Sequence, residues 1–379
     1  MRSVRFVQAS DFHLHPDRPE RLAALAAVVR VATTERADFL LIPGDLFDAP
    51  EASDPLRGSV RSLLEAFDGT TIVVPGNHDL DPRDPARSAF PAGSDYGRRT
   101  IVLAKPPYEI RDAHRAGSSG LRIVGVPYRS GSTLGRDLAG LETESLHTVL
   151  LAHGTLQLAG LEWLAETEGQ ESAYYPIVER DLRGRFAYAA LGHLHARATF
   201  DAWTADAAWG YAGSPIAITR GELGRRHAVV VDFVPGRGVD DLRRIPLETP
   251  YWTECAETLL PWDDVDALVR RVTEGLAATS DPSDADRGIR IRVDGYVDGD
   301  EADLRERLET LARSAQARFR RVEIDVSGAI TVRAVVEHHP WLAELLARLH
   351  RRAKREGTSQ AVVRRAAGLL VAAARETPR

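Results

Sequence analysis

Five short apolar stretches in the first 195 residues each run directly into a cluster of Asp, Asn or His side chains. These stretches have the length and β-branched content of buried strands, and amphipathic helical segments separate several of them. Loops at the carboxyl ends of neighbouring strands converge, so such clusters meet at one edge of a sheet. The pattern predicts a layered α/β domain whose polar residues gather at that edge.

Short strands make up most of the secondary structure predicted in this part of the chain. A helix is predicted over Pro19–Glu35, where Leu22, Leu25 and Val28 recur on one face. Prolines and glycines from Pro235 to Tyr251 indicate an irregular connection and a domain boundary near residue 250. The strands are predicted at Val4–Ala9, Phe39–Ile42, Thr71–Val74, Leu121–Val126, Thr148–Ala152, Tyr188–Leu191 and His227–Phe233.

The polar clusters carry side chains that can bind a metal ion. Asp11 and His13 follow the first strand, and in extended backbone two residues at this spacing point to the same side. Asp45 follows the second strand beside Gly44, which lets the backbone come close, so the Asp45 carboxylate can bridge two ions. The other clusters are Gly76-Asn77-His78-Asp79, Leu151-Ala152-His153-Gly154 and Gly192-His193-Leu194-His195.

Each motif alone is weak evidence for a metal site, because a histidine near a strand end is more often a hydrogen-bonded structural residue. Together the motifs provide seven oxygen and nitrogen ligands and no thiolate, a set that suits manganese, iron or zinc in a hydrolytic pair of ions. The seven candidate ligands are Asp11, His13, Asp45, Asn77, His153, His193 and His195.

The five motifs resemble those of the calcineurin-like metallophosphoesterase superfamily over about the first 230 residues. Within it, the segments Gly44–Asp48, Val73–Asp79 and Tyr211–Pro215 are most similar to the SbcD-type DNA repair nucleases. The resemblance implies a layered β-sandwich flanked by helices, with a smaller α+β capping domain and a helical C-terminal tail. It also implies a dimetal phosphodiesterase that acts as a manganese-dependent DNA exonuclease or endonuclease in DNA repair.

The resemblance further implies two metal positions that share Asp45. Manganese is the first candidate for both ions, with iron and zinc as alternatives. One ion would be held by Asp11, His13, Asp45 and His195. The other would be held by Asp45, Asn77, His153 and His193.

Other residues of the same motifs are implied to act on the substrate. His78 would protonate the leaving alkoxide, and Asp79 or Asp48 would orient its ring. The alternative for Asp79 is a carboxylate that caps a loop. Candidates for contacts to substrate phosphates are Arg83, Arg87 and Arg129, although an ordinary solvated surface also explains these residues.

The second half of the chain is predicted to fold separately from the first. The predicted regions are a metallophosphoesterase catalytic domain over residues 1–245, a capping domain over 250–337 and a helical tail over 338–379. The elements predicted in the capping domain are helices at Asp263–Leu276 and Glu301–Leu311, a strand at Ile289–Val297, and a hairpin of Val322–Val326 with Ile330–Val335 around Ser327-Gly328.

Two helices are predicted in the tail, and one of them carries an apolar stripe beside a cluster of arginines. The resemblance implies that this tail binds an SMC-like, SbcC-type ATPase. The alternative is that the stripe packs on the capping domain and the arginines are simply exposed. The stripe consists of Trp341, Leu342, Leu345, Leu346 and Leu349.

Composition limits the environment and the partners. The net charge of −6 does not indicate a protein that coats nucleic acid, so DNA binding requires a local basic patch. Cys255 is the single cysteine, which excludes an intramolecular disulfide and fits a reducing cytoplasm. No apolar run approaches the roughly 18 residues of a membrane helix, and no export signal is recognisable. We therefore expect a soluble cytoplasmic protein without a membrane partner, and a homodimer is compatible with the sequence.

Three functional hypotheses remain open from the sequence. The leading one is a manganese-dependent DNA nuclease that works with an ATPase partner. A small-molecule phosphodiesterase or phosphatase for cyclic nucleotides or nucleotides is the second, and it predicts a narrow pocket roofed by the second domain. The third is a scaffold that recruits partners around a degenerate metal site, but all seven candidate ligands and His78 are present.

Overall fold

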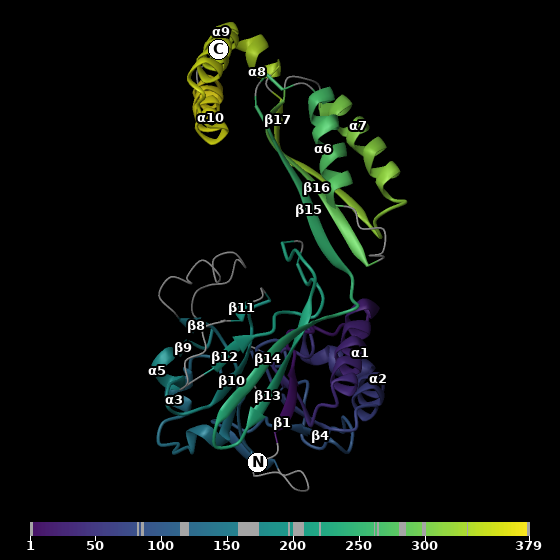
Figure 1. Ribbon diagram of the computed structural model, residues 1–379, viewed down its shortest axis with the longest axis vertical. Helices are drawn as coiled ribbons and strands as arrows, with labels where there is room; N and C mark the ends of the chain where they lie inside the picture. The colour runs from purple at the N-terminus through teal and green to yellow at the C-terminus, as the bar shows by residue number, and fades with distance from the viewer. Residues whose placement is uncertain are drawn as a thin grey trace. The chain divides into compact units, whose positions relative to one another are not determined.

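A computed structural model describes residues 3–81, 83–84, 87–113, 121–157, 174–195, 198–199, 208–219, 221–260, 262–263, 265–279, 286–297, 301–331 and 333–376. The chain divides into two compact units, Met1–Pro250 and Tyr251–Arg379 (Figure 1), each with its own apolar core. No helix in the described part of the chain is long and apolar enough to cross a membrane.

Two six-stranded sheets form the first unit and pack face to face. The first sheet has the order β14 (Gly238–Pro246), β13 (His227–Val234), β1 (Val4–Gln8), β2 (Phe39–Pro43), β3 (Thr70–Val74), β4 (Thr100–Val102). The second has the order β11 (Ala198–Thr199), β12 (Ala208–Tyr211), β10 (Tyr188–Gly192), β7 (Thr148–His153), β6 (Leu121–Val126), β5 (Glu109–Ala113). The predicted β-sandwich flanked by helices is therefore confirmed.

The central strands of both sheets run parallel, and their carboxyl ends lie at the same edge of the sandwich. β1 pairs with β2 and β2 with β3, while β10 pairs with β7 and β7 with β6. A buried polar link joins the two sheets near this edge: the Tyr188 hydroxyl donates to Gln8 Oε1 at 2.5 Å. The Gln8 amide in turn donates to the carbonyls of Leu191 at 3.1 Å and Gly210 at 2.9 Å. The register between the sheets is thus held by hydrogen bonds as well as by packing.

Helices cover the outer faces of the sandwich. α1 (Pro19–Thr34) and α2 (Ser53–Glu65) pack on the first sheet, where Leu25, Val28 and Val60 are fully buried. The short helices α3 (Leu134–Asp137) and α5 (Glu179–Leu182) contribute to the core on the outer face of the second sheet. The smaller elements of this unit are the 3₁₀ turns η1 (Pro50–Ala52) and η2 (Ser145–His147) and the strand pair β8 (Leu156–Gln157) and β9 (Ile177–Val178).

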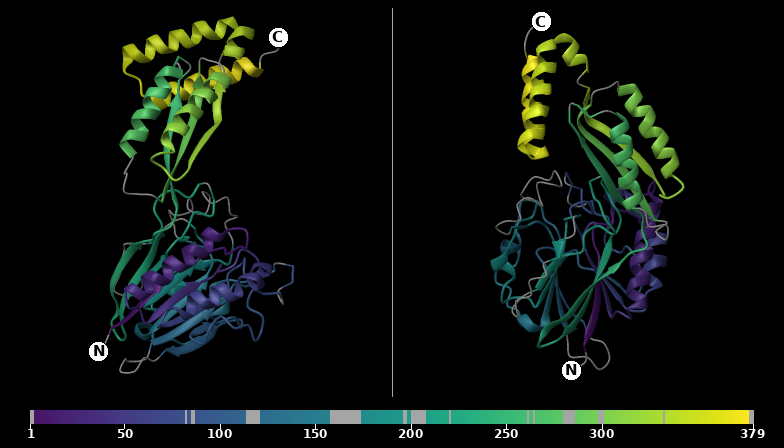
Figure 2. Two further views of the ribbon diagram at one scale, coloured as in Figure 1. Left: turned by 90° about the vertical axis from the view of Figure 1, so that its right-hand side faces the viewer. Right: turned by 45° about the horizontal axis from the view of Figure 1, so that its top comes forward.

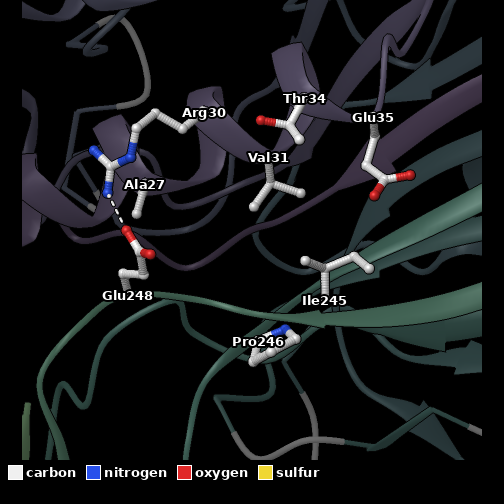
Figure 3. Close-up of a pocket in the computed structure, with 8 residues that line it drawn as sticks. All are labelled: Ala27, Arg30, Val31, Thr34, Glu35, Ile245, Pro246 and Glu248. Atoms are coloured by element: carbon white, nitrogen blue, oxygen red, sulfur yellow. Dashed lines mark ion pairs between the residues drawn. The ribbon is translucent and has the colours of Figure 1, made fainter. Parts of the chain in front are cut away.

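A cavity of about 330 Å³ lies between α1 and β14 (Figure 3). An ion pair between Arg30 and Glu248, 3.6 Å apart, spans one end of it. The remaining lining residues are Ala27, Val31, Thr34, Glu35, Ile245 and Pro246. None of the candidate site residues lines this cavity, so it is separate from the chemistry described below.

The second unit contains a parallel sheet whose successive strands are connected by helices (Figure 2). Its strand order is β15 (Tyr251–Leu259), β16 (Arg287–Val297), β17 (Val322–Thr331). α6 (Val265–Thr279) and α7 (Glu301–Ala315) connect these strands and share a core with them through Leu268, Val272 and Leu304. The chain then continues through α8 (Arg333–His338), α9 (Pro340–Glu356) and α10 (Gln360–Glu376).

Two local predictions are wrong. The segment predicted to form a hairpin around Ser327-Gly328 is a single strand, β17. The chain does not turn at Gly328, which pairs with Asp294 next to a shift in the β16–β17 register. A Cβ at Gly328 would lie 2.0 Å from Asp294 Oδ1, so the glycine serves close packing rather than a turn. The segment predicted as an irregular connection contains the edge strand β14 and the start of β15.

Because the two units have separate cores, we expect a destabilising substitution in one unit to leave the stability of the other unchanged. Leu268→Ala should lower the free energy of unfolding of the second unit by about 2–5 kcal/mol, because it leaves a cavity in a core that the described residues of the first unit do not share. Hydrogen–deuterium exchange measured by mass spectrometry would locate the effect. Equal acceleration of exchange in both units would contradict this account.

Candidate metal centre

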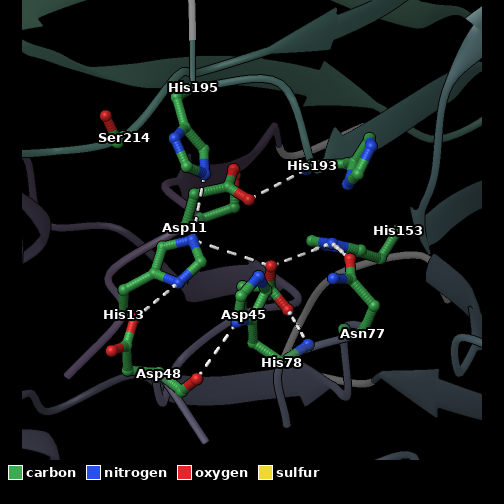
Figure 4. A network of polar contacts seen from close by, with 12 residues as sticks. Asp11, His13, Asp45, Asp48, Asn77, His78, His153, His193, His195 and Ser214 are labelled. Atoms are coloured by element: carbon green, nitrogen blue, oxygen red, sulfur yellow. Dashed lines mark hydrogen bonds and ion pairs between the residues drawn. The ribbon is translucent and has the colours of Figure 1, made fainter. Parts of the chain in front are cut away.

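The predicted polar clusters meet at the carboxyl edge of the two sheets (Figure 4). The loops after β1, β2 and β3 supply residues from one sheet, and the ends of β7 and β10 supply residues from the other. The side chains gathered there include Asp11, His13, Asp45, Asp48, Asn77, His78, His153, His193 and His195.

A first group of donor atoms is formed by Asp11, His13 and His195, whose candidate ligand atoms lie within 4.8 Å of one another. The Nε2 atoms of His13 and His195 are 2.9 Å apart. Asp45 Oδ2 lies 3.7 Å from His13 Nε2. All three residues of the group are almost completely buried, so the donors face one another rather than water.

A second group forms around His153. Its Nε2 lies 3.2 Å from Asp45 Oδ2 and 2.9 Å from Asn77 Oδ1. Asp11 also places a carboxylate oxygen within 4.8 Å of donor atoms of Asp45 and His153. The carboxylate of Asp45 therefore faces both groups, which is the position that a bridging ligand would need.

The partners of the Nδ1 atoms determine what the Nε2 atoms can do. His153 Nδ1 lies 3.0 Å from the carbonyl oxygen of Pro43, and His195 Nδ1 lies 3.0 Å from Glu222 Oε1. His13 Nδ1 lies 3.2 Å from Asp48 Oδ1. The carbonyl oxygen of Pro43 can only accept a hydrogen bond, and Glu222 is ionised, so the Nδ1 atoms of His153 and His195 carry a proton. In the neutral rings their Nε2 atoms then present a lone pair, whereas His13 Nδ1 makes no hydrogen bond that would fix its tautomer.

The lone pair of His195 Nε2 faces His13 Nε2 at 2.9 Å, a distance at which two nitrogens need a proton or a cation between them. The same holds for His153 Nε2 among the oxygens of Asp45 and Asn77. Imidazole, carboxylate and amide donors are the ligands of manganese, iron and zinc in proteins. These donor groups therefore fit divalent ions, and in the metal-free protein a proton on an imidazole takes the place of an ion.

His193 enters the site differently from the other histidines. Its backbone amide donates to Asp11 Oδ1 at 2.9 Å. Its ring lies 5.3 Å from the ring of His153 and 5.6 Å from that of Tyr174, measured between centroids. None of the donor groups found among the described residues includes the His193 ring. The assignment of His193 as a ligand thus stays a prediction.

Strained backbone brings the first donors together. Asp11, His13 and Asp45 have φ angles of 60°, 47° and 51°, in the left-handed region. The prediction that extended backbone aligns Asp11 with His13 is therefore wrong, because β1 ends at Gln8. Such conformations cost about 1–3 kcal/mol each and persist only where their surroundings hold them. Gly44 is required here, since a Cβ on it would lie 2.1 Å from His153 Nδ1.

His78 and Asp79 are neighbours in sequence but have different surroundings. His78 is exposed, and its Nδ1 lies 3.0 Å from the backbone oxygen of Asp48. Its ring centroid is 4.6 Å from that of His13, so the ring borders the donor groups. Of the two residues expected to orient this ring, Asp48 does so through its main chain rather than its carboxylate.

Asp79 is fully buried, and its carboxylate accepts hydrogen bonds from backbone amides. The donors are the amides of Leu46 at 3.2 Å, Phe47 at 2.9 Å and Gly76 at 2.9 Å. Asp79 therefore ties the loop after β2 to the loop after β3, which is the loop-capping alternative. Burial and the nearby charge of Asp45 nevertheless raise the pKa of Asp79 to about 7.

The three arginines proposed to contact substrate are not equivalent. Arg129 pairs with the buried carboxylate of Asp137 and also donates to Ser132 Oγ at 3.0 Å. Exposed Arg87 pairs with Glu51 at 2.5 Å and with Asp81 at 3.3 Å. Exposed Arg83 has a backbone amide bonded to Asp81. Arg129 and Arg87 would have to share or exchange these partners to bind a phosphate.

Sequence reasoning missed two residues beside the site. Glu222, which binds His195, lies 27 residues further along the chain, and no spacing rule links the two. Burial would raise the pKa of Glu222, but His195 and Arg226 hold it at about 2, so it is ionised. Tyr174 is 40% exposed with its ring beside His193. Its only sequence signal is an aromatic pair before an apolar strand.

Charge inside the cluster is balanced between carboxylates and imidazoles. Burial alone would raise the pKa of Asp45, but the imidazoles of His153, His13 and His78 hold it far below its usual range. Burial would lower the pKa of His153, yet Asp45 raises it to about 9. For His193, burial and repulsion by His153 lower the pKa to about 3. Without a metal ion, His153 is therefore charged at neutral pH and His193 is neutral.

Comparison with known proteins places these features in a family. Residues 4–197, about half of the 379-residue chain, match a family model described as calcineurin-like phosphoesterase. The chain is 26% identical over 292 residues to a subunit of the nuclease SbcCD from Rhodobacter capsulatus, an alignment that covers 65% of this chain and 70% of the relative.

Two further similarities are weaker. The chain is 24% identical over 220 residues to YhaO, an uncharacterized metallophosphoesterase of Bacillus subtilis, and this alignment covers 52% of the chain. The chain spans only half of the length of that relative, 50%. A solved structure of Yfce, a phosphoesterase from E. coli, is 15% identical with a TM-score of 0.30, and the match covers 64% of this chain and 100% of that one.

Metal binding should release a proton from His153 and should tighten as the pH rises. Below a pKa of about 9 the His153 ring is protonated, so an incoming ion must displace that proton. Calorimetric titration with Mn²⁺ at about pH 7, in buffers of different ionisation enthalpy, should show about one proton released. His153→Asn should abolish this buffer dependence. A binding heat and affinity independent of buffer and pH in the unchanged protein would contradict the prediction.

Proposed function

The chain belongs to the calcineurin-like phosphoesterase family and is a metal-dependent phosphoesterase, and we propose that its substrate is DNA. The observation that carries the enzymatic part is the set of buried Nε2 and oxygen atoms that face one another at the sheet edge. The relative named as part of a nuclease supports the choice of DNA.

Two divalent ions, manganese first, would bind to the two donor groups. When bound, such ions polarise a phosphate ester and make water a nucleophile near neutral pH. The proposed ligands of one ion are Asp11, His13, Asp45 and His195. The proposed ligands of the other are Asp45, Asn77, His153 and His193. The chain's own part in this is to hold the donors in place without water around them.

His78 is the proposed proton donor to the leaving oxygen. The carbonyl oxygen of Asp48 accepts from its Nδ1, so in the doubly protonated ring the second proton, on Nε2, is the one that can pass to the leaving oxygen. The exposure of the ring and its position beside His13 would bring it to the edge of the reacting phosphate. The backbone amide of His78 donates to Asp45 Oδ1 at 2.8 Å, which ties the acid to the proposed bridging ligand.

Tyr174 suggests how a DNA strand would be held. Its partly exposed ring beside His193 offers a face on which an unpaired base can stack. Phosphate contacts would come from arginines, and the candidates are Arg83, Arg87 and Arg129. The net charge of −6 means that any attraction of DNA has to come from such local groups.

The tail is the proposed contact for an SMC-like, SbcC-type ATPase. Leu342 and Leu346 of the predicted stripe pack against Ala367 and Val371 of α10, so this part of the stripe is used inside the tail. Large apolar side chains remain exposed beside it, and they are Trp341 (41%), Leu345 (36%), Val362 (58%) and Leu369 (67%). These exposed apolar side chains support the proposal that the tail binds a protein partner.

His78→Ala should separate DNA cleavage from hydrolysis of an activated ester. Without the acid, cleavage of end-labelled DNA with Mn²⁺ should fall by about 10²–10⁴-fold, because an alkoxide is a poor leaving group. Hydrolysis of bis-p-nitrophenyl phosphate should fall by less than about tenfold, since nitrophenolate leaves without help. His147→Ala, a change outside the site, serves as the control.

Two outcomes would count against these roles. An equal loss on both substrates would contradict the assignment of His78 as the leaving-group acid. If the unchanged protein hydrolyses the ester but leaves both single- and double-stranded DNA intact, with and without the ATPase, the substrate is a small phosphodiester instead.

Val362→Glu combined with Leu369→Glu should weaken binding of the ATPase by at least about tenfold, because two charges then replace exposed apolar contacts. Ester hydrolysis should not change, as neither residue is among the proposed metal ligands or the proposed acid. Co-elution of the two proteins in gel filtration measures the effect, and Arg351→Glu on the charged face of α9 is the matched control. Undiminished co-elution of the double variant would remove the tail from the interface.

A further inference from the structure

The two histidines whose Nε2 atoms face each other have similar groups behind them. Behind each imidazole lies a carboxylate, and behind each carboxylate lies an arginine. We call these arrangements the first clamp, made by Arg21, Asp48 and His13, and the second clamp, made by Arg226, Glu222 and His195. They come from opposite sheets of the sandwich, since His13 follows β1 and His195 follows β10.

In the second clamp, the carboxylate of Glu222 is only 8% exposed and is surrounded by donors. His195 Nδ1 lies 3.0 Å from Oε1, and Arg226 Nη2 donates to Oε2 at 2.8 Å. Its other partners are the amides of Ile218 (3.1 Å) and Thr219 (2.9 Å) and the hydroxyl of Ser214 (2.7 Å). With both oxygens engaged on several sides, the carboxylate has little freedom to rotate.

The arginine of each clamp also reaches past the carboxylate to the histidine itself. Arg226 Nη1 donates to the backbone oxygen of His195 at 3.2 Å. Arg21 Nη1 donates to the backbone oxygen of His13 at 2.6 Å and lies 3.1 Å from Asp48 Oδ1. The main chain and the imidazole of His195 are thus both held by the Glu222–Arg226 ion pair, whereas the Arg21–Asp48 pair holds the main chain of His13 and only lies near its ring.

We propose that Glu222 and Arg226 are positioning residues that aim His195 Nε2 at one metal position. This inference rests on the proposed metal function. A buried ion pair adds little net stability, because the desolvation of both charges offsets their attraction. The hydrogen bond to His195 indicates a function for this ion pair, since a carboxylate on Nδ1 fixes the orientation of the ring and makes Nε2 more basic.

The proposal predicts an asymmetry between the two positions. His153, in the second donor group, has the neutral carbonyl of Pro43 on its Nδ1 instead of a carboxylate. Loss of the Glu222 charge should therefore weaken the position that uses His195 and leave the His153 position almost unchanged. A purely structural role for Glu222 predicts no such difference between positions.

The test is a calorimetric titration of the full chain with Mn²⁺, followed in parallel by electron paramagnetic resonance. In Glu222→Gln, one binding event should weaken by about 10–100-fold, and the other should change by less than about threefold. The signal of two coupled ions should give way to that of one ion. Asp137→Asn is the matched control, because Asp137 is an equally buried carboxylate bound to Arg129, Ser132 and Tyr175 rather than to a proposed ligand.

Several results would overturn the proposal. Unchanged binding of both ions in Glu222→Gln would do so, as would an equal loss in Asp137→Asn. If Glu222→Gln does not fold, Arg226→Lys supplies the same test, since lysine cannot bridge Glu222 and the His195 carbonyl together, and unchanged binding there has the same meaning. An unchanged protein that binds no pair of Mn²⁺ ions would instead refute the proposed function, which separates the two failures.

Discussion

The Asp45 carboxylate is the contact on which the geometry of the site depends. Its Oδ1 accepts the amide of His78, and its Oδ2 faces His13 from one sheet and His153 from the other. Holding a buried carboxylate there requires left-handed backbone at Asp45 and glycine at position 76, where a Cβ would lie 2.2 Å from Asp45 Oδ1. The amide cluster on Asp79 stabilises this strained loop. His78, the two donor groups and the sandwich are therefore joined through one side chain.

A cost accompanies this arrangement, because buried lone pairs and carboxylates repel one another in the metal-free protein. A proton on His153 offsets part of the repulsion, and divalent ions would offset it further. The folding of the sandwich supplies the energy that assembles the donors before any ion arrives. The family match ends at residue 197, whereas Glu222 and Arg226, which support His195, lie beyond it.

The strand-end motifs could be read from the sequence because polar residues after apolar strands converge whenever the strands are parallel. The backbone conformation that brings Asp11 and His13 together could not be predicted, because left-handed φ angles at these two residues leave no local sequence pattern. Glu222 could not be predicted for another reason: its partner His195 follows β10 and lies 27 residues earlier in the chain, and only the folded chain brings the two together. The prediction of a turn at Gly328 was wrong because, in a sequence, a glycine needed for close packing cannot be distinguished from a glycine in a turn.

The most direct test of this account is anomalous diffraction from crystals of the protein soaked in Mn²⁺. Two peaks are expected: one among Asp11, His13, Asp45 and His195, and one among Asp45, Asn77 and His153. A refined structure would then show whether the ring of His193 turns to join the second ion. No peak, a single peak, or a peak between His78 and Asp48 instead would contradict the central claim that Asp45 joins two metal positions.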